Sequence, residues 1–272
     1  MRIYYKSGAD EREISLDQPP YWMQTGDFLN HSWDYVLSGK RIKKLEKTVQ
    51  EKEFTITIFG RTKNEYDANI NFLYEIFEQD VLENVPGKLY FGEYYLSCFI
   101  YASEKEEWES GCDSMDDTLS LIETHPFWVK EHPYAFKASE ITSTNNKRYA
   151  GRYAYRYANG LNNTEIVNDH YAECNFKMRI YGPCTKPSVY IGGYEYHVDI
   201  ILQEGEYLEI DSAAETVAKV MTSGIRVNAF NNRSFINSVF RPIQTGRQVI
   251  FWNGKFDFDL VLYEERSTPK WQ

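Results

Sequence analysis

Hydrophobic and polar residues alternate along much of this chain, and that two-residue period predicts β-strands. In the segment EFTITIFG, residues 53–60, the side chains of Phe54, Ile56 and Ile58 fall on one face of a strand and the residues between them on the other. Similar runs recur to the end of the sequence. The pattern therefore predicts a mostly β protein.

Glycine-containing turns between alternating runs predict three tight hairpins. The first turns at 91–93 in KLYFGEYYLSCFIYAS, the second at Gly192-Gly193 in SVYIGGYEYHVDIIL, and the third at Asn253-Gly254 in VIFWNGKFDFDLVLY. Turns of this kind need positive φ, which Gly and Asn supply at the lowest cost. Short strands separated by such turns fill the second half of the chain and favour a β-sandwich.

One segment has a helical period instead. Asn64 is a candidate N-cap, Pro86-Gly87 ends the segment, and a helix over about 64–82 is expected between them. Apolar residues recur there at steps of three and four, which predicts an amphipathic helix with one docked face: Tyr66, Ile70, Leu73, Phe77 and Val81.

The composition changes after Phe136, where the polar stretch KASEITSTNNKRYAGRYA favours a linker or loop at a domain boundary. We therefore expect two domains. Residues 1–138 would form an α+β domain with one long helix, and residues 139–272 would form a β-sandwich.

The net charge of −10 argues against a dedicated nucleic-acid-binding protein, which needs a basic surface to displace phosphate counterions. One segment, GKRIKKLEK, departs from this balance, and a solvated loop or strand edge is its plainest interpretation. Its basic residues are Lys40, Arg41, Lys43, Lys44 and Lys47.

The chain has 22 Tyr, 16 Phe and 6 Trp, a content that suits both strands and protein–protein interfaces. The start MRIYYKSGADE does not resemble a signal peptide, and the sequence has no apolar run of about 18 residues that would predict a membrane span. The four cysteines form no CxxC pair, so we expect reduced thiols made in a cytoplasm rather than a zinc site.

The segment THPFWVKEHP contains two histidines near two glutamates, Glu123 and Glu131, and is the first candidate for a metal or acid–base site. His125 and His132 are seven residues apart, which separates them by more than about 20 Å in an extended chain. Each also precedes a proline, which favours extended geometry. A shared metal ion is therefore not expected.

Two acidic groups are further candidates. Asp257 and Asp259 share one face of a strand, as a glycosidase pair would, but the alternation of the phenylalanines and leucines around them predicts acids that face water. The stretch CDSMDD lacks the glycine and distal glutamate of a calcium-binding EF-hand loop, which favours a plain acidic loop. No nucleophile, phosphate-binding or zinc motif is present. We expect no catalytic residue, cofactor or metal.

Several segments, in order, resemble the distal tail protein (Dit) family of long-tailed phages and prophages of Gram-positive bacteria. They are FTITIFG, the predicted helix, VPGKLYFGEYYLSCFIYASEKEEWES, the Pro-Phe-Trp at 126–128, FKMRIYGPCTKPSVYIGGYEY, GEYLEIDSAAETV, and the final run that closes with ERSTPKW. The resemblance covers nearly the whole chain. Residues before Asn30 and the segment 139–168 do not contribute to it.

The resemblance implies a structural, non-enzymatic virion protein made in the bacterial cytoplasm and located at the tail tip. Members form a six-membered ring from their N-terminal domains, and each subunit carries a galectin-like β-sandwich outside the ring. The ring would join the tail tube protein to the tail-tip protein and dock receptor-binding proteins, without a membrane.

The resemblance also assigns candidate residues for the ring interface and for the domain junction. The GKRIKKLEK segment falls where the family builds a long hairpin between neighbouring subunits, so its five basic residues, with Phe54, Ile56 and Ile58, are the candidate interface. We expect these cations to meet acidic surface on the adjacent subunit and to offset repulsion among six chains of charge −10. DNA would cross the ring only in transit, through a lumen lined by acidic or neutral side chains.

The expected domain junction consists of an apolar cluster that ends the first domain and a proline that restricts the chain after it. Pro126, Phe127 and Trp128 would close the first domain, and Pro133 would stiffen the exit toward the second.

Three other functions fit parts of the sequence. A carbohydrate-binding β-sandwich would use exposed aromatic residues among the six tryptophans Trp22, Trp33, Trp108, Trp128, Trp252 and Trp271. A glycosidase would use Asp257 or Asp259. A ring component of a phage-tail-like bacteriocin would have the same chemistry as a phage protein, and the sequence does not separate the two.

Overall fold

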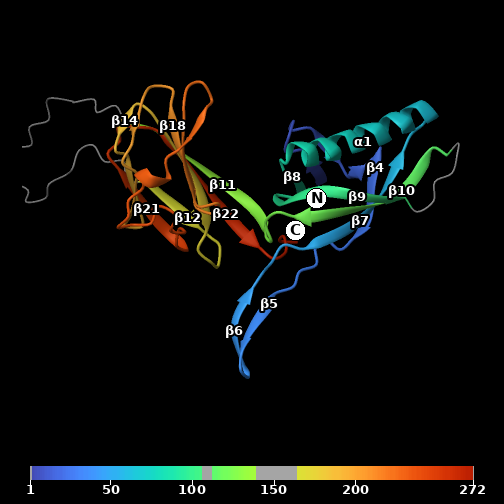
Figure 1. Cartoon of the computed structure of the whole chain (residues 1–272), viewed down its shortest axis with the longest axis horizontal. Helices are drawn as coiled ribbons and strands as arrows, with labels where there is room; N and C mark the ends of the chain where they lie inside the picture. Colours follow the sequence, from blue (N-terminus) through green and yellow to red (C-terminus); the bar gives the residue numbers. More distant parts are fainter. Residues whose placement is uncertain (1, 106–111, 139–163, 272) are drawn as a thin grey trace, which may run out of the picture. The chain divides into compact units, whose positions relative to one another are not determined.

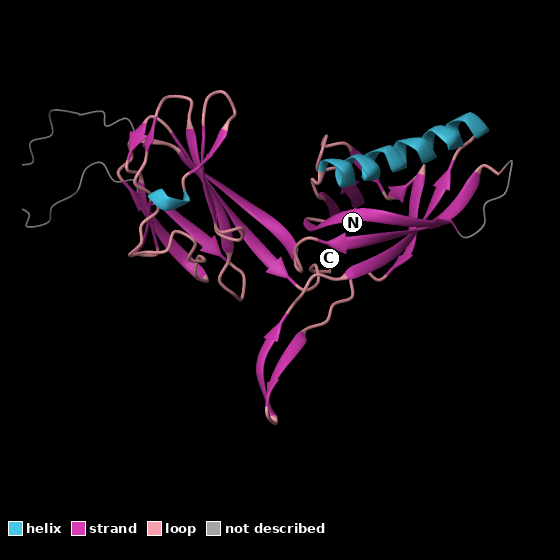
Figure 2. Ribbon diagram, in the orientation of Figure 1, coloured by secondary structure: helices cyan, strands magenta, loops and turns pink. Residues whose placement is uncertain are grey.

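The computed structural model describes residues 2–105, 112–138 and 164–271. The chain divides into two compact units (Figures 1 and 2): unit 1 is Met1–Lys130 with Glu265–Gln272, and unit 2 is Glu131–Glu264. The described residues are mostly in β-strands, with α1 as their one α-helix. The mostly β fold with one long helix is thus confirmed. The linker predicted after Phe136 lies, from residue 139 onward, outside the described residues, and the predicted domain boundary stays a prediction.

Unit 1 is built on one antiparallel sheet in the order β2-β1-β8-β9-β10-β7-β4-β3. Among the described strands, β5 and β6 pair only with each other. The elements of this unit are β1 Ile3–Lys6, β2 Glu13–Ser15, β3 Asp17–Gln18, β4 Tyr21–Gly26, β5 Asp34–Ser38, β6 Arg41–Glu46, β7 Glu51–Phe59, α1 Lys63–Glu83, β8 Gly87–Phe91, β9 Tyr94–Lys105 and β10 Ser114–Glu123.

The core of unit 1 lies between α1 and the sheet. Leu73, Ile76 and Phe77 of the helix belong to the same buried cluster as alternate residues of β7, β8, β9 and β10. In β7 the predicted alternation is confirmed, because the side chains of Phe54, Ile56 and Ile58 are at most 1% exposed. A helix on one face of an antiparallel sheet gives both elements a place to bury their apolar sides.

The helix α1 matches its predicted length closely but not its predicted cap or face. Thr62, not Asn64, is the N-cap, and its Oγ1 accepts a hydrogen bond from the Glu65 amide at 3.2 Å. At the other end Asn84 adopts a left-handed conformation, with φ 55°. Val81 is 43% exposed, contrary to prediction, because the buried stripe is turned toward Ile76 and Asp80.

Asp80 is a buried carboxylate on an otherwise apolar helix face, and it fixes the start of the chain. Its oxygens accept hydrogen bonds from Tyr5 Oη at 2.7 Å, Ser7 Oγ at 2.6 Å, and the amides of Gly8 at 3.1 Å and Ala9 at 3.0 Å. These four donors satisfy an anion that would otherwise be costly to bury. The contact links the last turns of α1 to the turn after β1.

Unit 2 contains two antiparallel sheets. Strands β20-β19-β18-β13-β22-β11 form one and β12-β21-β15-β16 the other, while β14 and β17 pair separately. Its elements are β12 Thr164–Asn168, β13 Asn175–Tyr181, β14 Cys184–Thr185, β15 Ser188–Ile191, β16 Tyr194–His197, β17 Ile201–Leu202, β18 Tyr207–Asp211, β19 Thr216–Val220, β20 Arg226–Asn228, η1 Phe230–Asn232 and β21 Gly246–Trp252, together with parts of β11 Trp128–Phe136 and β22 Phe258–Arg266.

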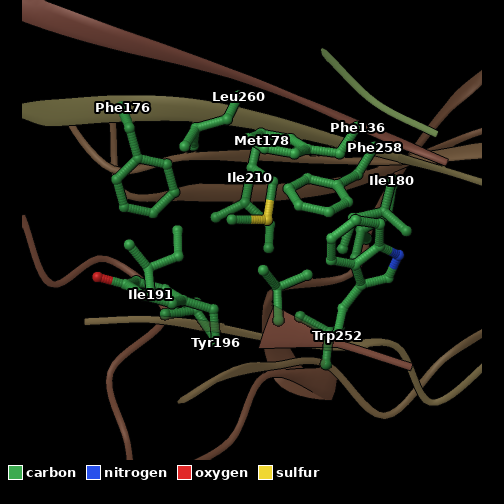
Figure 3. Close-up of a cluster of buried hydrophobic side chains, with 14 of the residues drawn as sticks. Phe136, Phe176, Met178, Ile180, Ile191, Tyr196, Ile210, Trp252, Phe258 and Leu260 are labelled. Carbon is green, nitrogen blue, oxygen red and sulfur yellow. The ribbon is translucent and has the colours of Figure 1, made fainter. Parts of the chain in front are cut away.

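The inner faces of the two sheets share one apolar core. Figure 3 shows Phe176, Met178 and Phe258 of the larger sheet facing Ile191 and Trp252 of the smaller one. The ring of Phe136 stacks on that of Phe258 at a centroid distance of 4.5 Å, and Trp252 meets the same ring edge-on at 5.2 Å. Unit 2 is therefore a β-sandwich; its predicted likeness to galectins stays a prediction.

Two of the three predicted hairpins are confirmed and one is wrong. The strands β8 and β9 pair around Gly92, and β15 and β16 pair around Gly192-Gly193, whose φ angles are 58° and 81°. After Asn253-Gly254, however, the chain crosses from β21 in one sheet to β22 in the other. Phe256 explains the crossing, because it is buried and its carbonyl accepts the Trp252 indole N–H at 3.1 Å. Burial in the core thus overrides the local turn preference.

Candidate functional site: the β5–β6 hairpin

The basic segment forms an isolated β-hairpin that extends away from the rest of unit 1 (Figure 1). Ser38 pairs with Arg41 across the turn, and Gly39 adopts φ 63°, a conformation that glycine reaches without strain. A two-stranded hairpin is marginally stable on its own in water. Nearly all residues of both strands are exposed.

A β-bulge gives the hairpin an apolar face. Tyr35 pairs with Leu45 and Leu37 pairs with Ile42, and the register shifts between Val36 and Leu37. Directly opposed residues lie on the same face, so the extra residue in β6 places Ile42 and Leu45 on one side together. We call these four side chains the apolar stripe: Tyr35, Leu37, Ile42 and Leu45, exposed by 63%, 56%, 61% and 56%.

The predicted cations surround this stripe. Lys40, Arg41, Lys43 and Lys44 are exposed, and Lys44 pairs with Glu46 of the same strand. Lys47 differs from them, since it is half-buried and its Nζ lies 4.9 Å from the centre of the Phe127 ring. Burial lowers the pKa of Lys47, although Glu123 acts in the opposite direction.

The chain at the base of the hairpin makes buried contacts within unit 1. Lys52 and Glu123 form a buried ion pair at 3.6 Å, and Lys52 Nζ also donates to the Asn30 carbonyl at 2.5 Å. Thr48 Oγ1 donates to Asp34 Oδ2 at 2.6 Å across the two strands. Removing either member of the buried pair would leave an uncompensated charge, so the pair stabilises the chain at the base of the hairpin.

The remaining interface candidates are not part of this surface. Phe54, Ile56 and Ile58 point into the core of unit 1 and are at most 1% exposed, so their side chains cannot contact a partner while the unit stays folded. They support the sheet from which the hairpin extends.

The junction candidates flank the point where the chain passes from unit 1 to unit 2. Trp128 is buried in unit 1, where it contacts Phe28 and Phe91 at centroid distances of 6.3 Å each. Phe127 is half-buried against Trp33 at 6.0 Å. Pro126 precedes them, and Pro133 is an exposed residue of β11 in unit 2. Their role at a junction stays a prediction.

The two histidines of the THPFWVKEHP segment have separate partners, both distant in sequence. His125 Nε2 lies 2.9 Å from Glu265, and His132 Nε2 lies 2.9 Å from Glu264. His170 Nδ1 lies 3.9 Å from the other oxygen of Glu264. The sequence pointed to Glu123 and Glu131 instead, because proximity along the chain does not reveal partners on another strand. Among the described residues no group of three or more metal-ligating side chains converges.

The carboxylates considered for catalysis or calcium binding have structural contacts. Asp257 accepts hydrogen bonds from Lys137 Nζ at 3.0 Å and the Ala138 amide at 2.6 Å, and Asp259 accepts one from Tyr181 Oη at 2.7 Å. The alternation around them is confirmed, since the flanking phenylalanines and leucines are buried.

The acidic stretch before residue 118 is not a loop, contrary to prediction. Asp116 and Asp117 belong to β10, and the buried Asp117 accepts a hydrogen bond from Ser103 Oγ at 2.7 Å. It also accepts one from the Tyr74 hydroxyl.

The tryptophans and cysteines are distributed as follows. Trp252 is the one tryptophan of unit 2, and it is buried in the sandwich core; Trp22, Trp33 and Trp271 of unit 1 are exposed. Trp108 lies outside the described residues. None of the four cysteines is in a disulfide; Cys98 and Cys174 are buried, and Cys112 and Cys184 are half-buried. No helix in the described part of the chain is long and apolar enough to cross a membrane.

The cations of the hairpin are apparent in the sequence, but the apolar stripe is not. Its signal was the pair of short apolar segments, YVL and IKKL, on either side of Ser-Gly-Lys-Arg. Alternation alone would put Ile42 and Leu45 on opposite faces, and only the bulge brings them together.

The fold is similar, over nearly the whole chain, to that of known phage tail proteins. SPP1 Dit, described as a paradigm of the hub adsorption apparatus of phages that infect Gram-positive bacteria, matches with a TM-score of 0.57 and 11% identity, covering 97% of this chain and 99% of its own. A chain of the phage P2 baseplate in its activated conformation with Ca matches with a TM-score of 0.64 and 14% identity, covering 99% and 100%.

The same baseplate with Sr gives a TM-score of 0.64 and 14% identity, covering 98% of this chain and 99% of the other. No family model matches the sequence, and no curated protein matches it significantly. The likeness therefore lies in the fold, as the resemblance in the sequence analysis predicted.

Proposed function

We propose that this chain is a structural protein of a phage tail, a Dit-like hub that forms a ring at the distal end of a long non-contractile tail. The observation that carries the proposal is the likeness of fold to phage hub and baseplate proteins from one end of the chain to the other. The likeness includes both units, so it is not the likeness of a single common domain.

The ring itself is proposed from the hairpin. It carries the apolar stripe and four exposed cations on a chain of net charge −10, and in one copy these side chains have little of their surface covered. Opposite charges on two copies would offset their overall repulsion. We propose a ring of six subunits, with the tail tube protein on one side and the tail-tip protein on the other.

Docking of receptor-binding proteins is proposed for unit 2, which has its own core and its own surface. The chain would be made in the bacterial cytoplasm and would act in the virion without catalysis. DNA would contact it only while passing through the ring. A tail-like bacteriocin would place the same chain in an equivalent ring.

Two measurements test the proposal. Light scattering across a range of protein concentrations should show a discrete closed oligomer, with six chains as the expected mass. Gold-labelled antibody against the chain should mark the tip of the tailed particles that contain it, as seen by electron microscopy. Label along the tail shaft or on the capsid would contradict the proposed location.

A carbohydrate-binding function is not favoured. The sandwich of unit 2 has one tryptophan, and it is 2% exposed, so no indole of that unit offers a surface on which a sugar ring could stack. A glycan array probed with the purified chain should give no signal above that of an unrelated β-sandwich.

A further inference from the structure

One stretch of unit 2 has the opposite charge to the chain as a whole. Residues 216–256 contain four arginines and two lysines but no aspartate or glutamate, although the net charge of the chain is −10. Three of these cations pair with carboxylates that precede the stretch in sequence: Lys219 with Glu206, Arg226 with Glu209 and Arg247 with Glu165. The charges of these three are therefore balanced within the unit.

Two arginines of the stretch contact aromatic rings instead. Among the described residues neither Arg233 nor Arg241 forms an ion pair with a carboxylate. The guanidinium carbon of Arg233 lies 3.6 Å from the centre of the Phe230 ring and 5.1 Å from that of the Phe235 ring. That of Arg241 lies 4.5 Å from the centre of the Tyr194 ring. Such contacts orient a guanidinium but do not neutralise its charge.

An apolar tip lies between the two arginines in sequence. Phe235 is 78% exposed, and Ile236, at 95%, is the most exposed large apolar side chain of the described residues. The backbone of the tip is fixed, because Ser234 Oγ accepts hydrogen bonds from the amides of Ile236 and Asn237 at 3.3 Å each. Side chains that are held in place before binding lose little conformational entropy in an interface.

The strand β16 holds the rest of this loop, residues 230–241. The Tyr194 hydroxyl donates to the Ser238 carbonyl at 3.0 Å, and the Tyr196 hydroxyl donates to the Arg241 carbonyl at 2.8 Å. The Ser234 amide donates to a carbonyl of the same strand, that of His197, at 3.2 Å. The loop is thus a fixed feature of the surface of unit 2.

Two carboxylates near the loop have partners of their own. Asp199 pairs with Lys186 at 2.9 Å, and Glu173 accepts a hydrogen bond from Gln244 at 2.6 Å. The loop therefore combines unneutralised positive charge with an apolar tip. A surface with carboxylates around an apolar pocket is complementary to it. A lipid bilayer is less suitable, because even a whole myristoyl chain gives only marginal membrane binding.

We propose that the loop 230–241 docks a second tail protein, whose contact surface has carboxylates around an apolar pocket. Phe235 and Ile236 enter the pocket, and Arg233 and Arg241 pair with the carboxylates. Aromatic and arginine side chains of this kind carry much of the binding energy in protein interfaces. The inference rests on the proposed function, in which unit 2 docks a further protein, and it specifies the surface and the chemistry of that contact.

Photocross-linking in the tailed particles tests the docking point. A benzoylphenylalanine in place of Phe235 should cross-link to a second tail protein, at a peptide in which acidic residues flank apolar ones. The same group in place of Tyr171, which is 75% exposed and also belongs to unit 2, is the matched control. The product with the second protein should be lost in the control, because the reactive group would lie away from the contact.

Further substitutions, each combined with the photoreactive group at position 235, test the chemistry. Arg233→Glu with Arg241→Glu should lower the yield of the cross-linked product on the order of tenfold, because attraction becomes repulsion. Arg233→Lys with Arg241→Lys keeps both charges and should keep most of the yield. Ile236→Ser should also lower the yield on the order of tenfold. Because Ile236 is exposed, this variant leaves the core unchanged, and the melting temperature of the purified chain checks that each variant folds.

The possible results separate the inference from the function. Selective cross-linking at position 235, lost on charge reversal, supports the inference. In particles labelled at the tail tip, cross-links only to another copy of this chain, equal cross-linking from position 171, or none would overturn it and leave the function standing. Sedimentation of the purified chain with phosphatidylglycerol vesicles, abolished by Ile236→Ser, would assign the loop to lipid and overturn it too. Absence of label at the tip would overturn the proposed function.

Discussion

Individual buried polar residues join segments of this protein that are distant in sequence, and Asp80 is the clearest case. It lies on the helix face that packs against the core, and four donors from residues 5–9 surround its carboxylate. Burial and the hydrogen bond to Asp80 raise the pKa of Tyr5, so the phenol remains a proton donor. One acidic residue thus ties the N-terminal strand to the helix.

Asp80→Ala should lower the free energy of unfolding by about 3 kcal/mol, because buried donors would lose their acceptor. Urea denaturation followed by tryptophan fluorescence measures the change. Asp67→Ala, an exposed acid on the same helix, is the control and should change stability by less than about 0.5 kcal/mol. Equal effects of the two substitutions would contradict the assigned role.

Glu209 is the corresponding residue in unit 2. Its carboxylate is 5% exposed, and it accepts hydrogen bonds from Arg179 Nε at 2.8 Å and Arg226 Nη2 at 2.7 Å. Burial by itself raises the pKa of Glu209, but the hydrogen bonds from the two arginines and the charge of Lys177 outweigh it and hold the pKa below its ordinary value of 4.5.

The stability that Glu209 contributes should therefore depend on pH. Because its pKa is lower in the folded chain than in the unfolded chain, the contribution is present above pH 4.5 and is lost as the pH falls through the folded value. Glu209→Gln should lower the free energy of unfolding by about 1–3 kcal/mol at pH 7. The difference in stability between the variant and the wild type should narrow below about pH 4. Denaturant titrations at several pH values measure this difference. Glu204→Gln, at an exposed glutamate, is the control. A stability difference between Glu209→Gln and the wild type that stays constant with pH would contradict the prediction.

At the scale of the element, the hairpin is structurally separate from the sheet of unit 1. The strands β5 and β6 contribute no partner strand to the sheet, while the buried Lys52–Glu123 pair at their base belongs to unit 1. The hairpin can therefore change without loss of the core. This separation supports the proposed role of the hairpin in assembly rather than in stability.

Shortening the hairpin tests that assignment. Tyr35 and Leu45 are directly opposed, so replacing residues 36–44 by Asn-Gly should close a two-residue turn between them. We expect the melting temperature to change by less than about 2 °C, since no buried contact is removed, while the assembled mass falls to that of the monomer. Calorimetry and light scattering measure the two effects.

The matched control keeps the length and the cations of the hairpin and changes only its turn glycine, with Gly39→Asn, because asparagine tolerates the φ of 63° found there. This variant should still assemble. A shortened hairpin that assembles normally would show that the contact between copies lies elsewhere.

At the scale of the whole molecule, the chain passes between two units that each have a complete core. Every buried residue of the unit 2 core lies between Phe136 and Leu262, and the strands on which the unit begins and ends, β11 and β22, are neighbours in its sheet. Such an arrangement is what independent folding requires.

Residues 131–264 alone should therefore fold. We expect a β-type circular dichroism spectrum and one cooperative unfolding transition in denaturant. Phe258→Ala in the same fragment should lower its stability by about 3–5 kcal/mol, because that ring packs against both Phe136 and Trp252. A gradual, non-cooperative transition of the unsubstituted fragment would contradict the prediction.

The sequence by itself determined the features that depend on near neighbours. The alternation in β7, the extent of α1 and the turns at Gly92 and Gly192-Gly193 follow from local periodicity and from backbone preferences, which act within a few residues. The absence of a catalytic motif and the cluster of cations on one segment were also visible there.

Only the tertiary structure decided which distant groups meet. The burial of Asp80, the partners of His125 and His132, and the crossing of the chain after Asn253-Gly254 all depend on contacts between segments far apart in sequence. The apolar stripe depends on a single extra residue in β6, since one inserted residue reverses the facing of every side chain that follows it in the strand. Local periodicity cannot reveal such a shift, because it is set by the pairing of two strands.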